Sequence, residues 1–319
     1  MSTISNQDLI LELKTMQRKQ NVMLALAVLG LFFGFLIFIV GIFEGAAAVI
    51  TGIVILGAGI LFLALWASRK KDLKNFAGER ITAPVLREFM ELESFDPNAF
   101  TDREELKTLS FLPGHNTEHG SDLIRGIYKG NRLELCDLTL QTITSTGKTV
   151  IVVTNFQGQL LSYGLGRTVE GCVEITKKTA GKPDGILKRM RNWGTSVSSG
   201  RTFENLETEN EAFNRMFDVR AENPHTAFLI LTPQFMERLM EVNEREATDF
   251  CFTGDRLYMA IRSEEDRFEI GGTIESASDV ETVRQAIRAD FMAAASLLDV
   301  LRENEFLFTQ ETQNRSIGK

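Results

Sequence analysis

Two histidines and two acidic residues lie close together after Pro113-Gly114, and their types could bind a metal ion. His115 and His119 are four positions apart, Glu118 lies between them, and Asp122 follows three positions later. Histidines at this spacing share one face of a helix, but this segment has the composition of a loop and does not match the zinc-protease motif. The metal candidates are therefore His115, His119 and Asp122, and the alternative is a polar loop with solvated imidazoles.

Two glycine-containing segments resemble nucleotide-binding motifs but lack required residues. Ser145–Thr149 resembles the end of a phosphate-binding loop, but Thr142 stands where the first glycine is needed. Gly164 and Gly166 begin a dinucleotide fingerprint, but Val169 occupies the position of its third glycine. No Ser/His/Asp, Cys/His or paired-carboxylate spacing indicates catalysis. The sequence therefore predicts no cofactor and gives no support for enzyme activity.

The charge distribution argues against nucleic acid as the main partner. The 319 residues carry 35 Lys and Arg against 43 Asp and Glu, a net charge of −8. Residues 1–74 have a net charge of +3, so residues 75–319 carry −11. Phosphate binding needs a basic face, which such an acidic part does not predict. The three cysteines, Cys136, Cys172 and Cys251, are odd in number and scattered, which favours buried thiols over disulfides.

Two uncharged runs, residues 22–43 and 45–66, predict a membrane hairpin. Each run would form a helix of roughly 33 Å, and a hydrocarbon core is about 30 Å thick. Only Glu44 separates the runs, so the helices must be antiparallel neighbours. The length of the first run and the presence of a second argue against a cleaved signal peptide, and the length of both argues against a buried soluble hairpin.

Basic residues flank this hairpin on both sides, and the turn between the runs has none. They are Lys14, Arg18 and Lys19 before it and Arg69, Lys70, Lys71 and Lys74 after it. Because such flanks stay cytoplasmic, we expect both termini on the cytoplasmic side of the membrane. Glycines four residues apart, such as Gly30 and Gly34, predict close helix contact, within the hairpin or with another membrane protein. The runs hold no ionisable residue, which disfavours an ion path through the hairpin alone.

The remaining sequence predicts an α+β fold with a mainly antiparallel sheet. The predicted organisation is an N-terminal segment over 1–21, the hairpin over 22–66, a cytoplasmic α+β domain over 67–303 and a flexible tail over 304–319. Helices are expected through about Glu93, over 102–109 and 210–217, over 234–246 after an N-cap at Thr232, and from Ser278 onward.

Strands are expected where the apolar residues change to a period of two. Residues 122–128 and 132–144 should pair across a Gly/Asn turn, and 250–252 should form a hairpin with 257–261. Residues 148–156 are apolar on both faces, which predicts a central strand. Weaker strands are expected over 160–163 and 172–177.

A glycine- and serine-rich stretch over 181–201 combines basic and apolar residues. Lys188, Arg189, Arg191 and Trp193 are its candidates for contact with an anionic membrane surface. The alternative is a solvated basic loop.

Several segments carry a family resemblance when they are taken in order. They are 121–126 with 130–135, 204–207 with 213–219, 231–239, and 255–261 with 268–269. Together with the hairpin, they resemble the bacterial membrane-protein family catalogued as domain of unknown function 3137, over about residues 10–300. The resemblance implies no activity, catalytic residue or cofactor. It implies a neighbourhood with LemA-like membrane proteins and a shared envelope complex. Residues 224–227 depart from the basic-aromatic pair expected there, which argues against a shared charged site.

These observations favour a membrane-anchored cytoplasmic module with an interaction or regulatory role. The alternative is a membrane-tethered enzyme or small-ligand sensor that would use His115, His119 and Asp122, and a structural or transport role ranks third. The sequence leaves the oligomeric state open.

Overall fold

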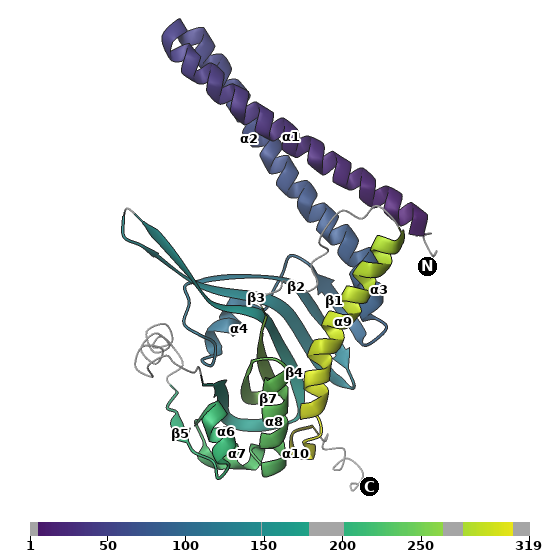
Figure 1. Cartoon of the computed structure of the whole chain (residues 1–319), viewed down its shortest axis with the longest axis vertical. Coiled ribbons are helices and arrows are strands. Elements are labelled where there is room, and N and C mark those ends of the chain that lie inside the picture. Colours follow the sequence, from purple (N-terminus) through teal and green to yellow (C-terminus); the bar gives the residue numbers. More distant parts are fainter. Residues whose placement is uncertain (1–5, 148, 179–200, 264–276, 309–319) are drawn as a thin grey trace, which may run out of the picture. The chain divides into compact units, whose positions relative to one another are not determined.

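The computed structural model describes residues 6–147, 149–178, 201–263 and 277–308. The chain divides into two compact units (Figure 1). The first contains the two long N-terminal helices, and the second contains the sheet with most of the shorter helices. The predicted membrane-contact residues Lys188, Arg189, Arg191 and Trp193 lie outside the described residues.

The N-terminal helices α1 (Asn6–Glu44) and α2 (Ala46–Ala77) form an antiparallel pair joined through Gly45. Gly45 has a φ of 125°, which explains why glycine stands at so tight a turn. Both helices are long and apolar enough to cross a membrane. Only 11% of the most apolar window of each is buried, unlike a core helix of a soluble protein.

Glycines mark the face on which α1 and α2 touch. A Cβ atom added at Gly34 would lie 2.7 Å from the backbone nitrogen of Leu56, and one added at Gly52 would lie 2.6 Å from that of Phe38. By contrast, nothing lies within 4 Å of such an atom at Gly57. The predicted packing of small residues within the hairpin is confirmed.

After α2 the chain passes through a π-helical turn η1 (Gly78–Thr82) into the short helix α3 (Ala83–Leu86). The prediction of a helix through Glu93 is wrong, since residues 91–96 form the strand β1 (Glu91–Asp96). β1 pairs with the next strand, and this long-range pairing overrides the helical spacing of the local sequence.

The second unit is built on one seven-stranded antiparallel sheet, in the order β1-β2-β3-β4-β6-β5, with β7 also paired to β4. Its other strands are β2 (Thr117–Tyr128), β3 (Asn131–Ser145), β4 (Val150–Lys177), β5 (Glu204–Leu206), β6 (Phe217–Ala221) and β7 (Thr248–Arg262). The long strand β4 pairs with β3 through its first half, with β6 near its end and with β7 along much of its length. The predicted α+β fold with a mainly antiparallel sheet is confirmed.

Two strand predictions differ from the structure in a related way. The predicted hairpin over 250–261 is wrong, because β7 runs through these residues as one strand. Gly254, with a φ of 58°, pairs with Val169 of β4, and the register of the pairing shifts on both sides of it. The two weaker strands predicted over 160–163 and 172–177 are parts of the single strand β4.

Helices cover both faces of this sheet. They are α4 (Arg103–Thr108), α6 (Glu211–Met216), α7 (Pro224–Ile230), α8 (Pro233–Arg245), α9 (Ala277–Leu301) and α10 (Glu305–Phe308). The predicted cap of α8 is confirmed, since Thr232 Oγ1 accepts a hydrogen bond from Phe235 N. The first residues of the predicted flexible tail form α10.

Apolar layers lie on the two faces. On the α4 face, Leu106, Phe111 and Leu112 pack with buried residues of the central strands. On the other face, the ring of Phe291 from α9 lies 5.9 Å from that of Tyr128 on β2. The predicted apolar stripe of α9 is therefore core, with Leu298 fully buried.

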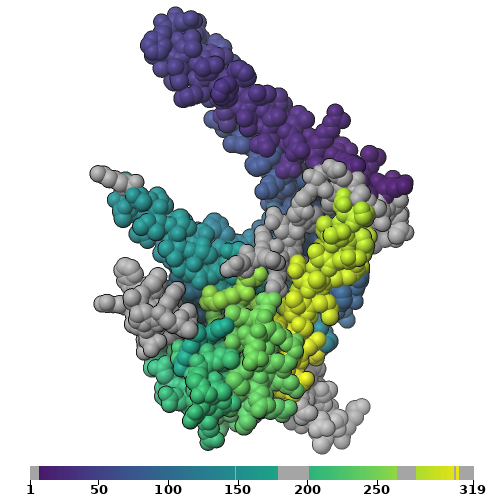
Figure 2. Space-filling model, in the orientation of Figure 1, coloured from purple at the N-terminus to yellow at the C-terminus, as the bar shows by residue number. Residues whose placement is uncertain are grey.

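The prediction that residues 148–156 form a central strand is wrong. The side chains of Val150, Ile151, Val152 and Val153 are between 43% and 63% exposed. A strand apolar on both faces is central only where other strands pair with both of its edges. Here the end of β3 and the start of β4 pair with each other beyond the last residues that pair with β2 and β7. They therefore leave the sheet as a two-stranded ribbon (Figures 1 and 2).

Candidate functional site

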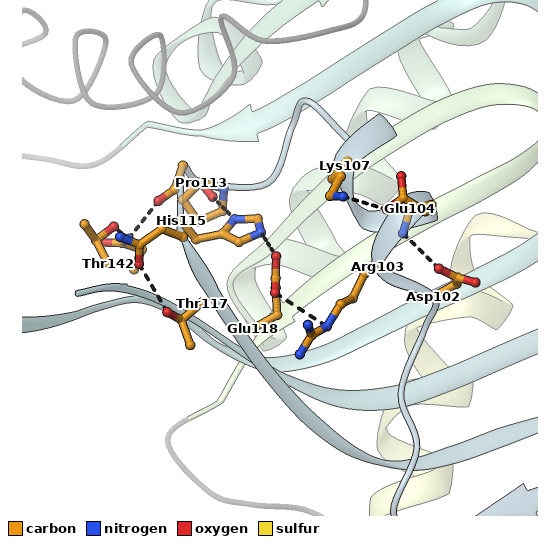
Figure 3. A network of polar contacts seen from close by, with 12 residues as sticks. Asp102, Arg103, Glu104, Lys107, Pro113, His115, Thr117, Glu118 and Thr142 are labelled. Atoms are coloured by element: carbon orange, nitrogen blue, oxygen red, sulfur yellow. Dashed lines mark hydrogen bonds and ion pairs between the residues drawn. The ribbon is translucent and has the colours of Figure 1, made fainter. Parts of the chain in front are cut away.

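The histidine cluster is built at the start of β2, and Figure 3 shows its contacts. His115 Nδ1 donates a hydrogen bond to the carbonyl oxygen of Pro113 at 2.9 Å, and its Nε2 lies 3.4 Å from Glu118 Oε1. Arg103 Nε lies 3.8 Å from the other carboxylate oxygen of Glu118. The His115 ring thus sits in a chain of charged and polar groups that joins the segment before β2 to α4 (Figure 3).

The other two metal candidates do not join His115. His119 lies within β2, not in a loop as predicted, and it is exposed. Because side chains alternate along a strand, it faces away from Glu118. Asp122 is buried in the bulge of β2, with a φ of 58°. Among the described residues, no group of three or more His, Cys, Asp or Glu side chains is placed to hold a metal ion.

Polar contacts near His115 fix the base of the β3–β4 ribbon. Asn155 Nδ2 donates to Thr142 Oγ1 at 2.6 Å and to the carbonyl oxygen of Gly114 at 2.7 Å. The backbone N–H of Asn116 donates to the carbonyl of Gln141 at 3.0 Å. The segment that was predicted to bind a metal therefore has a structural role, because its hydrogen bonds hold the base of the ribbon.

A second polar region is an open depression of about 230 Å³ at the β2–β3 turn end of the sheet. Its lining comes from four strands: Glu93 from β1, Arg125 and Gly126 from β2, Arg132, Leu133 and Glu134 from β3, and Arg256 from β7. Glycine is required at position 126, because a Cβ atom there would lie 2.4 Å from the carbonyl oxygen of Glu91. Three arginines against two glutamates make this a cationic spot in a strongly acidic part of the chain.

Glu134 is the most constrained charge of the depression. Arg125 Nε donates to Glu134 Oε2 at 2.7 Å, and Thr101 Oγ1 donates to Glu134 Oε1 at 3.1 Å. The hydrogen bond to Glu134 raises the pKa of the Arg125 guanidinium. The charges of Arg125 and Glu134 thus neutralise one another, and the two side chains form one wall of the depression.

The other two arginines outnumber the remaining glutamate of the lining, Glu93, and leave it with a net positive charge. Arg132 is exposed, and Arg256 donates through Nη1 to the hydroxyl of Ser162. Among the described residues, no ion pair joins either arginine to a carboxylate. A guanidinium presents a planar fork of donors that matches carboxylate or phosphate oxygens, so this pair could bind an anionic group.

The lining supports binding better than covalent chemistry. Its described residues include no histidine, serine, cysteine or lysine. The thiol of Cys136, two positions after Glu134 on β3, contacts Thr101 Oγ1 at 3.4 Å and is fully buried, and this burial raises its pKa to about 12. A thiol that stays protonated is a poor nucleophile.

Sequence reasoning missed this depression, although the pairing of Arg125 with Glu134 could have been predicted from the turn between their strands. The Lys129-Gly130 turn, with φ values of 47° and 88°, fixes the register of β2 and β3. That register places Arg125 directly opposite Glu134. Arg256, by contrast, reaches the site because β7 pairs with β4, and the sequence predicted a turn at that position.

The comparison with protein families concerns the second half of the chain, from β4 to α9. Residues 154–303 match the family described as Protein of unknown function (DUF3137). The predicted family is thereby confirmed for this part of the chain, which is just under half of its length. The quoted motifs from residue 204 onward lie inside the DUF3137 match, whereas the motif pair at 121–135 lies outside it.

The DUF3137 match assigns no activity, and of the lining residues it includes only Arg256. No curated protein and no solved structure matches the chain.

Proposed function

We propose that this chain is a membrane-anchored interaction module whose arginine-lined depression binds an acidic segment of a protein partner. The observation that carries the proposal is the pair Arg132 and Arg256, which outnumbers the one other carboxylate of the lining, Glu93, and which no ion pair joins to a carboxylate among the described residues. Helices able to cross a membrane support the anchoring. The basic flanks support an orientation with both termini and the sheet unit in the cytoplasm, and the family resemblance suggests that the membrane is a bacterial inner membrane.

The form of the depression favours a partner segment over an enclosed ligand. Pockets for small ligands are concave and typically hold about 300–1,000 Å³. This depression is smaller, at about 230 Å³, and one of its cations, Arg132, is exposed. It suits one or two carboxylate side chains presented by another surface. A LemA-like membrane protein of a shared envelope complex is the partner that the family resemblance suggests.

Charge reversal tests this proposal on the full chain. Tagged wild-type chain, Arg132→Glu and Arg132→Glu/Arg256→Glu are purified from detergent-solubilised membranes, and co-purifying proteins are quantified. Arg132 is exposed, so its single variant should keep the fold. Arg215→Glu on α6 is the matched control, because that side chain is 75% exposed and far along the sequence from the depression.

The proposal expects one partner that the wild type and the Arg215 variant retain and that both Arg132 variants lose at least tenfold. Equal recovery by all variants, or no partner above background in any of them, contradicts it.

A small-anion sensor is the second candidate, since two arginines that no described ion pair occupies also suit a free dicarboxylate. Its signature is a rise in the melting temperature of the wild-type chain with millimolar succinate, absent in Arg132→Glu.

A further inference from the structure

The ribbon formed by the ends of β3 and β4 presents apolar side chains on both of its faces. The register sets Ile143 opposite Val152 and Ser145 opposite Val150, so these share one face. Ile151 and Val153 lie on the other face, since side chains alternate along a strand. The five apolar side chains are between 37% and 63% exposed. Monomeric soluble proteins rarely leave such patches open to water.

The near absence of charge on the ribbon limits the kinds of surface that it could bind. Between Asp137 and Arg167 in the sequence, the only charged residue is Lys148, and there is no acidic residue. The remaining polar residues of the ribbon are mainly threonines. An apolar surface without acidic residues is complementary to the interface of an anionic membrane.

The base of the ribbon is held while its end projects. Leu140 and Phe156, on paired positions, are buried, and Asn155 ties the base to the segment before β2. From these residues the strands extend about five residues, which corresponds to about 17 Å. Figure 2 shows this part protruding from the surface of its unit, in teal. The ribbon thus presents apolar groups at a fixed distance from the core.

We propose that the end of this ribbon inserts into the lipid–water interface of the membrane to which the chain is anchored. A protein that docks on one face of the ribbon would leave the other apolar face in water, whereas a lipid interface surrounds both. The helices α1 and α2, which are able to cross a membrane, belong to the same chain and would keep lipid at high local concentration.

The backbone limits how deep the ribbon enters. Among the described residues, no strand pairs with the outer edge of β3 beyond Gln141 or with that of β4 before Gly158. Unpaired N–H and C=O groups are costly in hydrocarbon, so these edges must stay at the level of the headgroups. The ribbon is therefore an interfacial contact and not a third membrane span.

A fluorescent label on the ribbon tests the proposal in the full chain. Val152→Cys is labelled with the environment-sensitive dye nitrobenzoxadiazole, and the chain is reconstituted in vesicles of equimolar phosphatidylcholine and phosphatidylglycerol. The three native cysteines are fully buried, which keeps their labelling low. A lipid that carries a nitroxide near the headgroup end of its acyl chain is the quencher. Arg215→Cys on α6 is the matched control position.

The proposal expects a blue-shifted dye at position 152 that loses more than half of its fluorescence to the nitroxide lipid, while the dye at 215 is unaffected. Adding Ile151→Asp and Val153→Asp, which alter exposed side chains, should abolish the quenching without changing the melting temperature. Equal quenching at both positions overturns the proposal. So does a blue shift without nitroxide quenching, which would report burial against a protein partner or a second copy of the chain. The result does not depend on the arginine-lined depression.

Discussion

The side-chain amide of Asn116 pairs with both backbone polar groups of Ile143. Its Nδ2 donates to the Ile143 carbonyl oxygen at 2.9 Å, and its Oδ1 accepts from the Ile143 N–H at 2.9 Å. One side chain thereby imitates a neighbouring strand and closes the outer edge of β3 where the ribbon begins. An edge closed in this way is less open to pairing with other chains.

Removal of this amide should loosen the base of the ribbon. In Asn116→Ala the Ile143 N–H loses its acceptor, and a hydrogen bond of about 1 kcal/mol corresponds to about fivefold faster local opening. Hydrogen exchange of peptides that contain Ile143 measures this, with β7 peptides as the internal reference. Asn116→Asp keeps the acceptor and should show a smaller effect. Unchanged exchange in both variants would refute the role given to Asn116.

The Arg125–Glu134 pair should stabilise the sheet unit. Glu134→Gln keeps the shape of the side chain but removes the charge that Arg125 and Thr101 hold. We expect a loss of about 1–3 kcal/mol, since hydrogen bonds to charged groups contribute that much and Arg125 is partly screened by solvent. Thermal melting of the full chain in detergent measures it. Glu211→Gln, which alters an exposed pair on α6, should change the melting temperature little. A similar melting temperature for both variants would argue against the prediction.

Alkaline pH should destabilise the sheet unit through its buried thiols and phenols. Burial raises the pKa of Cys136 to about 12 and also raises the pKa of Tyr258. The neutral forms are thus favoured in the folded state, and this stabilisation is complete below the pKa of a free thiol, about 8.5. It is lost as the pH rises toward 12. The melting temperature should therefore fall from pH 9 upward, with a shallower slope in Cys136→Ala. A melting temperature that stays constant or rises above pH 9 would contradict the prediction.

The hairpin offers a matched pair of substitutions on one helix. In Gly52→Leu a side chain meets the backbone of α1 at Phe38, whereas Gly57→Leu adds a side chain in open space. Overpacking of this kind costs about 1–3 kcal/mol or more. The melting of helical signal in detergent should shift down for position 52 and hardly at all for position 57. Equal shifts would show that the two glycines are not distinguished by helix contact.

The sequence predicted those features of the fold that depend on local patterns. Two uncharged runs gave the long helices, the Lys129-Gly130 turn gave the β2–β3 pairing, and Thr232 gave the start of α8. Features set by long-range pairing were missed. The exposed valines of the ribbon have the same local pattern as a buried strand, and only the ends of the neighbouring strands distinguish the two.

Long-range strand pairing also explains why the sequence did not predict the candidate site. His115 and His119 are neighbours in the sequence, but β2 turns one of them away from Glu118. The β2–β3 turn brings Arg125 and Arg132 together, but Arg256 joins them only because β7 pairs with β4.

Anchoring by an antiparallel hairpin is the central claim, and site-specific labelling in intact bacterial cells tests it most directly. A single cysteine is introduced at the turn, Glu44→Cys, or at the basic flank, Lys71→Cys, and a membrane-impermeant maleimide is added before or after permeabilisation. The account predicts that the Glu44 variant is labelled in intact cells and that the Lys71 variant is labelled only after permeabilisation. Labelling of the Lys71 variant in intact cells, or of neither variant until the cells are opened, would contradict it.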